Sequence, residues 1–406
     1  MGNLKELFHG ISVVIDDEID SKDKDTEIDQ LIKTLEHENC YVVKFKKIPA
    51  LAAAKNLEGA SLFILDWNFH PVSSDQVNSG VRIPDVLQKK YETANIAFLK
   101  EIKKLRFAPI FIFTNESVDY VRRKLKNDKL INEDDGDHIF VKNKKDVLTK
   151  GLFNTLEEWI KGHPSAYVLK KWEQAYATAK NSLFNEFYQN SRYWPIVIWE
   201  THLKDGVSPS VELGNLIARN IDSRMNPVDF DQTILVKMHN HQIQNISTDE
   251  IKKVLAGERF IKNNFLDQNS YLTGDIFRKN AKKFYINIRP ECDCVARTGE
   301  GADSPLLYLL SGSPLTDSQI KENYKPSYGA ILEPDDAAII FAVFEGKTLR
   351  FNFKELQILT VQQIQVDSYV RIGRLIPPYT TRLVQRYAAY SQRFGLPRIP
   401  DKAIPT

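Results

Sequence analysis

The chain has 406 residues, 42% of them hydrophobic and 27% charged, which is the composition of a globular protein rather than a disordered one. A chain of this length is too long to pack around a single hydrophobic core, so we expect two or three domains. The 55 basic and 53 acidic side chains leave a formal net charge of +2, so the charge balance neither favours nor excludes nucleic acid and gives no strong attraction to anionic lipid.

The N-terminal residues lack the apolar core of a signal peptide, and no stretch approaches the 18 or so apolar residues of a membrane span. We therefore expect a cytoplasmic protein that does not bind membranes. The three cysteines, Cys40, Cys292 and Cys294, are too few for a disulfide framework and fit a reducing compartment.

The first 162 residues alternate short apolar runs with helical patterns, as in a parallel sheet that is buried on both faces. The predicted strands cover residues 11–15, 40–45, 61–65, 109–113 and 138–141, and the clearest helical patterns cover 25–38, 118–130 and 146–161. This pattern predicts an α/β fold, a doubly wound five-stranded parallel domain over residues 1–162.

Beyond the breaker cluster Gly162-His163-Pro164 the pattern changes twice. Helical periodicity at residues 166–187, 211–225 and 248–260 predicts a helical connector domain over 163–266. Short apolar runs at 284–288, 306–310, 337–344, 348–353 and 358–361 predict a small β-rich barrel or sandwich over 267–375, with a hairpin turn at Glu345-Gly346. Residues 376–406 are expected to form a C-terminal basic helix and tail, and the helical pattern itself extends over 369–390 with an interruption at Pro377-Pro378.

Polar side chains follow four of the five strands predicted in the first domain. They are Asp16-Asp17-Glu18, Asp66-Trp67-Asn68, Thr114-Asn115 and Lys142. Because the carboxyl ends of parallel strands gather at one edge of the sheet, we expect these groups to meet there. Carboxylates that meet in this way repel one another, and an oxygen-rich site of this kind suits Mg²⁺.

The strings VVIDDE, LFILDWN, IFIFTN and IFVKN resemble the CheY-like receiver domain of bacterial response regulators, over residues of about 8–160. The resemblance implies a phospho-acceptor at Asp66, a switch hydroxyl at Thr114 and a phosphate-pairing lysine at Lys142. It also implies that Mg²⁺ is held by Asp16, Asp17, Asp66 and the backbone carbonyl of Asn68.

The sequence departs from the family pattern at two places. Asn143 follows Lys142, where family members usually have proline. Thr114 lies 48 positions after Asp66 (114 − 66 = 48), which indicates an insertion around residues 70–99. The inserted segment is either a lid or partner-docking surface, or a solvated loop with a lengthened helix.

The C-terminal part carries weaker signals. His239-Asn240-His241 and Cys292-Asp293-Cys294 hold four potential zinc ligands, although their spacing differs from the common zinc ribbons and buried thiols with surface histidines are the alternative. A short resemblance to SH3-like barrels at residues 273–276 and 287–290 suggests that Asp275, Arg289 and Asp293 line a groove, unless Arg289 pairs with an acid to fix a turn.

Basic and aromatic residues also alternate near the C-terminus. This tract suits a nucleic acid backbone or an acidic partner, or simply packs the last helix onto its own domain. Its residues are Arg371, Arg374, Arg382, Arg386, Arg393, Tyr379, Tyr387 and Tyr390.

The sequence is thus interpreted as an atypical response regulator of a two-component system, a phospho-accepting signalling protein rather than an enzyme. Its expected partners are a sensor kinase or GHKL-type ATPase and a second copy of the chain, and the lack of a familiar promoter-binding domain suggests stress or antiphage signalling. Two alternatives stay open: a nuclease-like hydrolase with a purely structural receiver, and a scaffold of a signalling complex.

Overall fold

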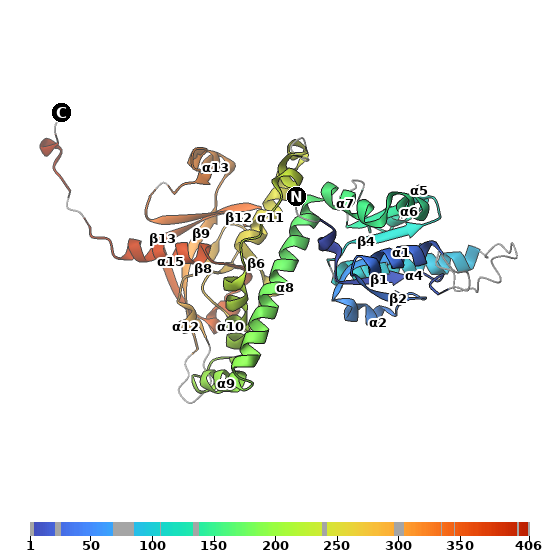
Figure 1. Ribbon diagram of the computed structural model, residues 1–406. Helices are drawn as coiled ribbons and strands as arrows, with labels where there is room; N and C mark the ends of the chain where they lie inside the picture. Colours follow the sequence, from blue (N-terminus) through green and yellow to red (C-terminus); the bar gives the residue numbers. More distant parts are fainter. Residues whose placement is uncertain are drawn as a thin grey trace. The chain divides into compact units, whose positions relative to one another are not determined.

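A computed structural model describes most of the chain (Figure 1). The described residues are 4–20, 26–67, 85–105, 107–132, 138–237, 242–295, 304–333, 335–344, 346–395 and 398–404. Within these ranges no helix is long and apolar enough to cross a membrane. The chain divides into two compact units, residues 1–186 with 220–241 and residues 187–219 with 242–406.

The first unit contains a five-stranded, all-parallel sheet in the order β2-β1-β3-β4-β5. The five predicted strands are confirmed, with bounds that shift by at most two residues. They are β1 (Ile11–Ile15), β2 (Tyr41–Phe45), β3 (Ala60–Leu65), β4 (Ile110–Thr114) and β5 (Ile139–Asn143).

Alternate residues of these strands enter two separate core clusters. Val13 and Ile15 pack with Phe98 and Leu125, whereas Val14 packs with residues such as Leu31. This accounts for the wholly apolar runs in the sequence, because a strand that is covered on both faces has no polar side. The helices of this part are α1 (Glu27–His37), α2 (Leu51–Ala54), α4 (Asp85–Leu105), α5 (Val118–Asn127), α6 (Lys144–Lys150) and α7 (Leu152–Gly162), with 3-10 turns η1 (Leu4–Phe8) and η2 (Lys55–Leu57).

One predicted helix of the first unit is broken in two. The pattern over residues 146–161 corresponds to α6 and α7, which are separated by Gly151 at φ +90°. Glycine reaches this conformation without the steric penalty of a side chain, so the chain can end one helix and begin the next within a single residue.

The helical patterns of the middle segment are confirmed as long elements. The largest is α8 (Pro164–Asn190), which carries Tyr167 into the first core cluster, where its hydroxyl accepts a hydrogen bond from the Asp231 backbone at 2.9 Å. The others are α9 (Trp194–Lys204), α10 (Pro209–Arg224) and α11 (Thr248–Arg259), with the π-helix η3 (Thr233–Lys237) and the 3-10 turns η4 (Ile243–Asn245) and η5 (Asn263–Phe265).

The second unit is built on a curled, seven-stranded antiparallel sheet, a half-barrel with the order β12-β13-β9-β8-β7-β14-β6 (Figure 1). Its strands are β6 (Phe260–Lys262), β7 (Asp275–Arg278), β8 (Phe284–Asn287), β9 (Leu306–Pro314), β12 (Ala338–Phe344), β13 (Lys347–Thr360) and β14 (Val370–Leu375). A separate small hairpin joins β10 (Tyr324–Lys325) to β11 (Ala330–Ile331). The helices are α12 (Glu291–Cys294), α13 (Asp317–Asn323), α14 (Val361–Val366) and α15 (Tyr379–Ser391), with turn η6 (Asp401–Ala403).

Two sequence predictions for this unit need correction, and a third is confirmed. The helical pattern over residues 369–390 begins as strand β14, whose residues alternate in burial and pair with β7 and β6, and the helix starts only at Tyr379. The runs at 348–353 and 358–361 are one long strand, β13. The predicted hairpin is confirmed by the pairing of Phe344 with Lys347.

Candidate functional site

Three carboxylates meet at the carboxyl ends of β1 and β3. Asp16 and Asp17 follow β1, Asp66 follows β3, and one ligand oxygen from each lies within 4.8 Å of the others. The strand register brings them together, since the Asp66 amide donates to the Ile15 carbonyl at 2.9 Å. Within the described part of the chain, this is the one cluster of His, Cys, Asp and Glu side chains arranged to hold a metal ion.

A buried lysine joins two of these carboxylates. The Nζ of Lys144 lies 2.7 Å from Oδ2 of Asp16 and 3.1 Å from Oδ2 of Asp66. Lys144 is 1% exposed, Asp16 0% and Asp66 5%, so all three charges are removed from water. The ammonium therefore acts as the internal counter-charge of the cluster.

Lys144, and not Lys142, is the lysine of this site. Strand β5 continues through Asn143, whose side-chain oxygen accepts a hydrogen bond from the Lys145 amide at 3.0 Å and so starts α6. Lys144 is consequently the first residue of α6 and turns toward the carboxylates. Lys142 still lies within the strand, is exposed, and places its Nζ 5.6 Å from the centre of the Phe140 ring.

The electrostatics of the cluster follow from burial and from charge pairing. Burial raises the pKa of Asp16; the negative charge of Asp66 adds to this, and Lys144 opposes it. Burial alone lowers the pKa of Lys144, but the carboxylates of Asp66 and Asp16 outweigh it and raise that pKa overall. Lys144 therefore stays protonated at neutral pH. Burial also raises the pKa of Glu18, beside the cluster.

The residues present fit a divalent cation. Three ionised carboxylates and one ammonium carry a net charge of −2 (−3 + 1), which a divalent cation would neutralise. Carboxylate oxygens are the ligands that hard cations prefer. Asp16, Asp17 and Asp66 are the residues that could hold the ion.

Of the remaining predicted site residues, Thr114 lies at the end of β4 and Asn68 lies outside the described residues. Thr114 is fully buried at the end of β4, next to β3, and its Oγ1 accepts a hydrogen bond from the Glu116 amide at 3.0 Å. The side-chain amide of Asn115 donates to Oε2 of Glu27 at 3.0 Å, which connects this strand end to α1. Residues 70–84 of the inserted segment also lie outside the described residues, which resume at α4.

No protein-family model and no curated protein matches this chain. The likeness to receiver domains thus rests on the strand order, the acidic cluster at the strand ends and the buried lysine.

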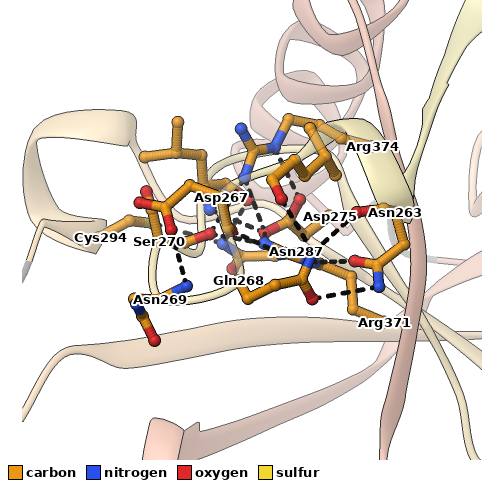
Figure 2. Close-up of polar contacts among 12 residues, drawn as sticks. Asn263, Asp267, Gln268, Asn269, Ser270, Asp275, Asn287, Cys294, Arg371 and Arg374 are labelled. Carbon is orange, nitrogen blue, oxygen red and sulfur yellow. Dashed lines mark hydrogen bonds and ion pairs between the residues drawn. The ribbon is translucent and has the colours of Figure 1, made fainter. Parts of the chain in front are cut away.

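The second unit contains a separate buried ionic cluster around Asp275. Figure 2 shows Arg371 and Arg374 converging on this carboxylate. Arg374 donates to both oxygens of Asp275, at 2.6 and 3.1 Å, and Nη1 of Arg371 donates to Oδ2 at 3.3 Å. The Leu272 amide donates to Oδ2 at 2.9 Å. Asp275, fully buried, is engaged on both oxygens and is therefore a structural anion rather than a general base.

The other candidate residues near the C-terminus also have structural partners. Arg289 pairs with Asp293 at 3.9 Å and lies over the Tyr308 ring, in agreement with the turn-fixing alternative. Cys294 is buried against Asn287 whereas Cys292 is exposed, and the two histidines of the zinc hypothesis lie outside the described residues.

The arginines of the basic tract are used to hold the second unit together. Arg382 and Arg386 both contact Glu333, a carboxylate whose side chain is 5% exposed, at 2.7 and 3.8 Å. Tyr387 and Tyr390 pack against Phe353 in the core. Arg371 and Arg374 of β14 are likewise paired within this unit. These contacts favour the alternative in which the tract packs onto its own domain, rather than the one in which it binds nucleic acid.

Proposed function

We propose that the first unit is a doubly wound, CheY-like receiver domain that accepts a phosphoryl group on Asp66 with the help of Mg²⁺. The observation that carries the proposal is the position of Lys144, whose buried ammonium contacts both the proposed acceptor and Asp16. A lone lysine–carboxylate pair would carry no net charge. Here one lysine serves two carboxylates from different strands, with a third beside them.

In the proposed reaction an Asp66 carboxylate oxygen attacks the phosphorus of a phosphorylated partner or small phosphodonor. The new O–P bond forms as the bond between phosphorus and the donor atom breaks, and the leaving group departs with that electron pair. Mg²⁺ supplies charge neutralisation for the transferring oxygens when bound. Lys144 supplies the second positive charge and pairs with a phosphoryl oxygen after transfer.

Thr114 is the proposed switch hydroxyl. Its Oγ1 is occupied by the Glu116 amide, so the hydroxyl is held at the end of β4. Phosphorylation of Asp66 adds about two negative charges, and a hydroxyl that donates to the phosphoryl group would pull the β4–α5 turn with it.

We propose that the signal leaves the receiver through the edge strand β5. A cavity of about 250 Å³ lies there, lined by Arg122 and Lys126 of α5, by Phe140 of β5, and by Glu158 and Trp159 of α7. An edge strand with both charged and aromatic neighbours suits docking of a partner, and the partners proposed are a sensor kinase or GHKL-type ATPase and a second copy of the chain. The half-barrel unit is then a non-classical output module, in a bacterial stress or antiphage pathway.

The hydrolase alternative is weaker than the signalling proposal. It requires Asp275 to act as a catalytic carboxylate, yet that carboxylate is neutralised by two arginines. The scaffold alternative remains distinguishable by experiment, because a scaffold assembles regardless of phosphodonor.

The test is incubation of the full chain with Mg²⁺ and acetyl phosphate or beryllofluoride, read by intact mass and by size exclusion. We expect Mg²⁺-dependent modification of the wild type, none in Asp66→Asn, and normal modification in the control Asp146→Asn, an exposed acid on α6. Failure of the wild type to gain a phosphoryl group or to bind the mimic contradicts the proposal. Assembly that is identical with and without phosphodonor favours the scaffold.

A further inference from the structure

The half-barrel unit holds a cavity of about 700 Å³ between α11, β6, the β12–β13 hairpin and β14. We call it the lysine cavity. The lining residues on α11 are spaced three or four apart, so they lie on one face of the helix, and residues of β6 extend this lining. They are Asp249, Lys252, Lys253, Ala256 and Gly257 on α11, then Phe260 and Lys262, with Asn263, Asn264, Phe344, Gly346 and Ile372 completing the lining.

One side of the lysine cavity is cationic. Lys252, Lys253 and Lys262 line it against a single described carboxylate, Asp249, whose side chain is 86% exposed and 4.0 Å from Lys252. Lys262 has no ion-pair partner among the residues that the structure describes. Glu250 also interacts electrostatically with Lys253. The three lysines that line the cavity still outnumber these nearby carboxylates, which favours an anionic ligand.

Other lining residues are apolar. Phe260 and Phe344 are buried, with ring centres 4.6 Å apart in an edge-to-face arrangement, and Ile372 extends this wall along β14. Two glycines leave room, because a Cβ added at Gly257 or Gly346 would meet nothing within 4 Å. The cavity thus offers space and an apolar wall for the uncharged part of a ligand.

A polar lining residue, Asn263, is held in place from the core. Nε of Arg371 donates to Oδ1 of Asn263 at 2.8 Å, and Arg371 is itself fixed by buried Asp275 (Figure 2). Nδ2 of Asn263 donates to Oε1 of Gln268 at 3.3 Å, so both ends of this amide are held within the protein. This part of the cavity wall is therefore fixed before any ligand arrives, which lowers the entropic cost of binding.

We propose that the lysine cavity binds a small phosphorylated aromatic molecule of the nucleotide class, with phosphate at the lysines and the planar base against the Phe260–Phe344 wall. The volume lies within the range of about 300–1,000 Å³ that is typical of small-ligand sites. The single apolar wall and the size favour one nucleotide over a nucleic acid strand, which needs successive stacking platforms along a groove. The receiver would then be joined to a unit that senses or uses a nucleotide.

The test is calorimetric titration of the full chain with ATP, AMP, pyrophosphate and a short single-stranded oligoribonucleotide. EDTA is included so that the acidic cluster of the first unit takes no metal-bound ligand. Lys253→Glu with Lys262→Glu removes the cationic side, and Gly257→Leu fills the cavity from α11. Lys321→Glu, at an exposed lysine on α13 that does not line the cavity, is the control for charge reversal elsewhere on this unit.

We expect ATP and AMP to bind the wild type. The double lysine variant should lose about tenfold in affinity for both ligands. Gly257→Leu should lose binding without a fall in its unfolding temperature. The last expectation follows because glycine is a poor helix former inside a helix. If Gly257→Leu does unfold, the affinity of the double lysine variant alone tests whether the cavity is the binding site. Lys321→Glu should bind as the wild type does.

Three results would overturn the proposal. The first is that neither ATP nor AMP binds at a ligand concentration of about 1 mM, because a dissociation constant above this value is weaker than that of a typical specific site. The second is pyrophosphate binding as tightly as ATP, which removes the role of the apolar wall. The third is binding of the oligoribonucleotide but of neither mononucleotide, which makes the surface a nucleic acid site. None of these depends on whether Asp66 is phosphorylated.

Discussion

Nζ of Lys144 lies 3.1 Å from Oδ2 of Asp66, and neither side chain is more than 6% exposed. This contact comes from two elements far apart in sequence, the end of β3 and the first residue of α6. Because Lys144 also holds Asp16, removing this one cation leaves two carboxylates without their nearest positive charge. The site is therefore stable only with a cation, whether ammonium, metal or both.

Lys144→Met is expected to lower the free energy of unfolding of the first unit by about 3–5 kcal/mol, as for other buried ion pairs that lose one partner. Denaturant titration in EDTA, monitored by tryptophan fluorescence, measures this. Lys142→Met, on the exposed face of β5, is the matched control and should change stability by less than about 0.5 kcal/mol. Equal effects of the two substitutions would mean that Lys144 is not the counter-charge of the cluster.

Mg²⁺ is expected to raise the unfolding temperature of the first unit. Binding to the folded state alone adds about 2.7 kcal/mol when the ion is at 100 times its Kd. Differential scanning calorimetry with and without Mg²⁺ measures the shift. Asp17→Asn removes one of the three carboxylates and should weaken the shift, whereas Asp146→Asn should not. A shift of the same size in Asp17→Asn would place the ion elsewhere.

The strand positions and the acidic cluster were predictable because they depend on local patterns. Apolar β-branched runs specify buried strands, and acids after two such runs must meet when the strands are parallel neighbours. The lysine was misplaced because its position depends on where β5 ends and α6 begins. The capping residue Asn143, followed by two lysines, was the available signal, since a cap at 143 makes Lys144 the first helical residue.

The C-terminal half was harder to predict because its polar residues pair over long distances. Asp275 and Arg371 are 96 positions apart, and nothing local in the sequence indicates that they meet. Val370–Leu375 was mistaken for the start of a helix because its basic residues look solvent-facing, yet Arg371 and Arg374 point into a buried cluster from strand β14. The resemblance of the first half gave no information about these contacts.

Cys292 is expected to react with a maleimide or disulfide reagent well before Cys294 and Cys40. Cys292 is exposed, whereas burial raises the pKa of Cys294 to about 11 and also raises the pKa of Cys40. At pH 8 about one Cys294 in a thousand is then the reactive thiolate, and labelling at 294 should accelerate as the pH rises toward 11. Peptide mapping after timed labelling measures the order. Early modification of Cys294 at pH 8 would contradict the buried position of its thiol.

Asp275→Asn is expected to loosen the half-barrel without affecting the first unit. The substitution keeps the shape of the side chain but removes the negative charge that compensates Arg371, whose side chain is 5% exposed, and Arg374. We expect a loss of about 3–5 kcal/mol, the usual cost of an uncompensated buried charge. Hydrogen exchange measures it locally: amides of β7 and β14, which carry these residues, should exchange faster, while those of β1 and β3 keep their wild-type rates.

Asp293→Asn is the control for this last prediction, because its carboxylate is 50% exposed and lies 3.9 Å from Arg289. An exposed pair of this kind contributes at most about 1 kcal/mol. Exchange rates that rise equally in both variants, or that stay unchanged in Asp275→Asn, would show that the arginines are solvated and that Asp275 is free for chemistry. That outcome would favour the hydrolase alternative over the signalling proposal, since the neutralised carboxylate is the main argument against a hydrolase.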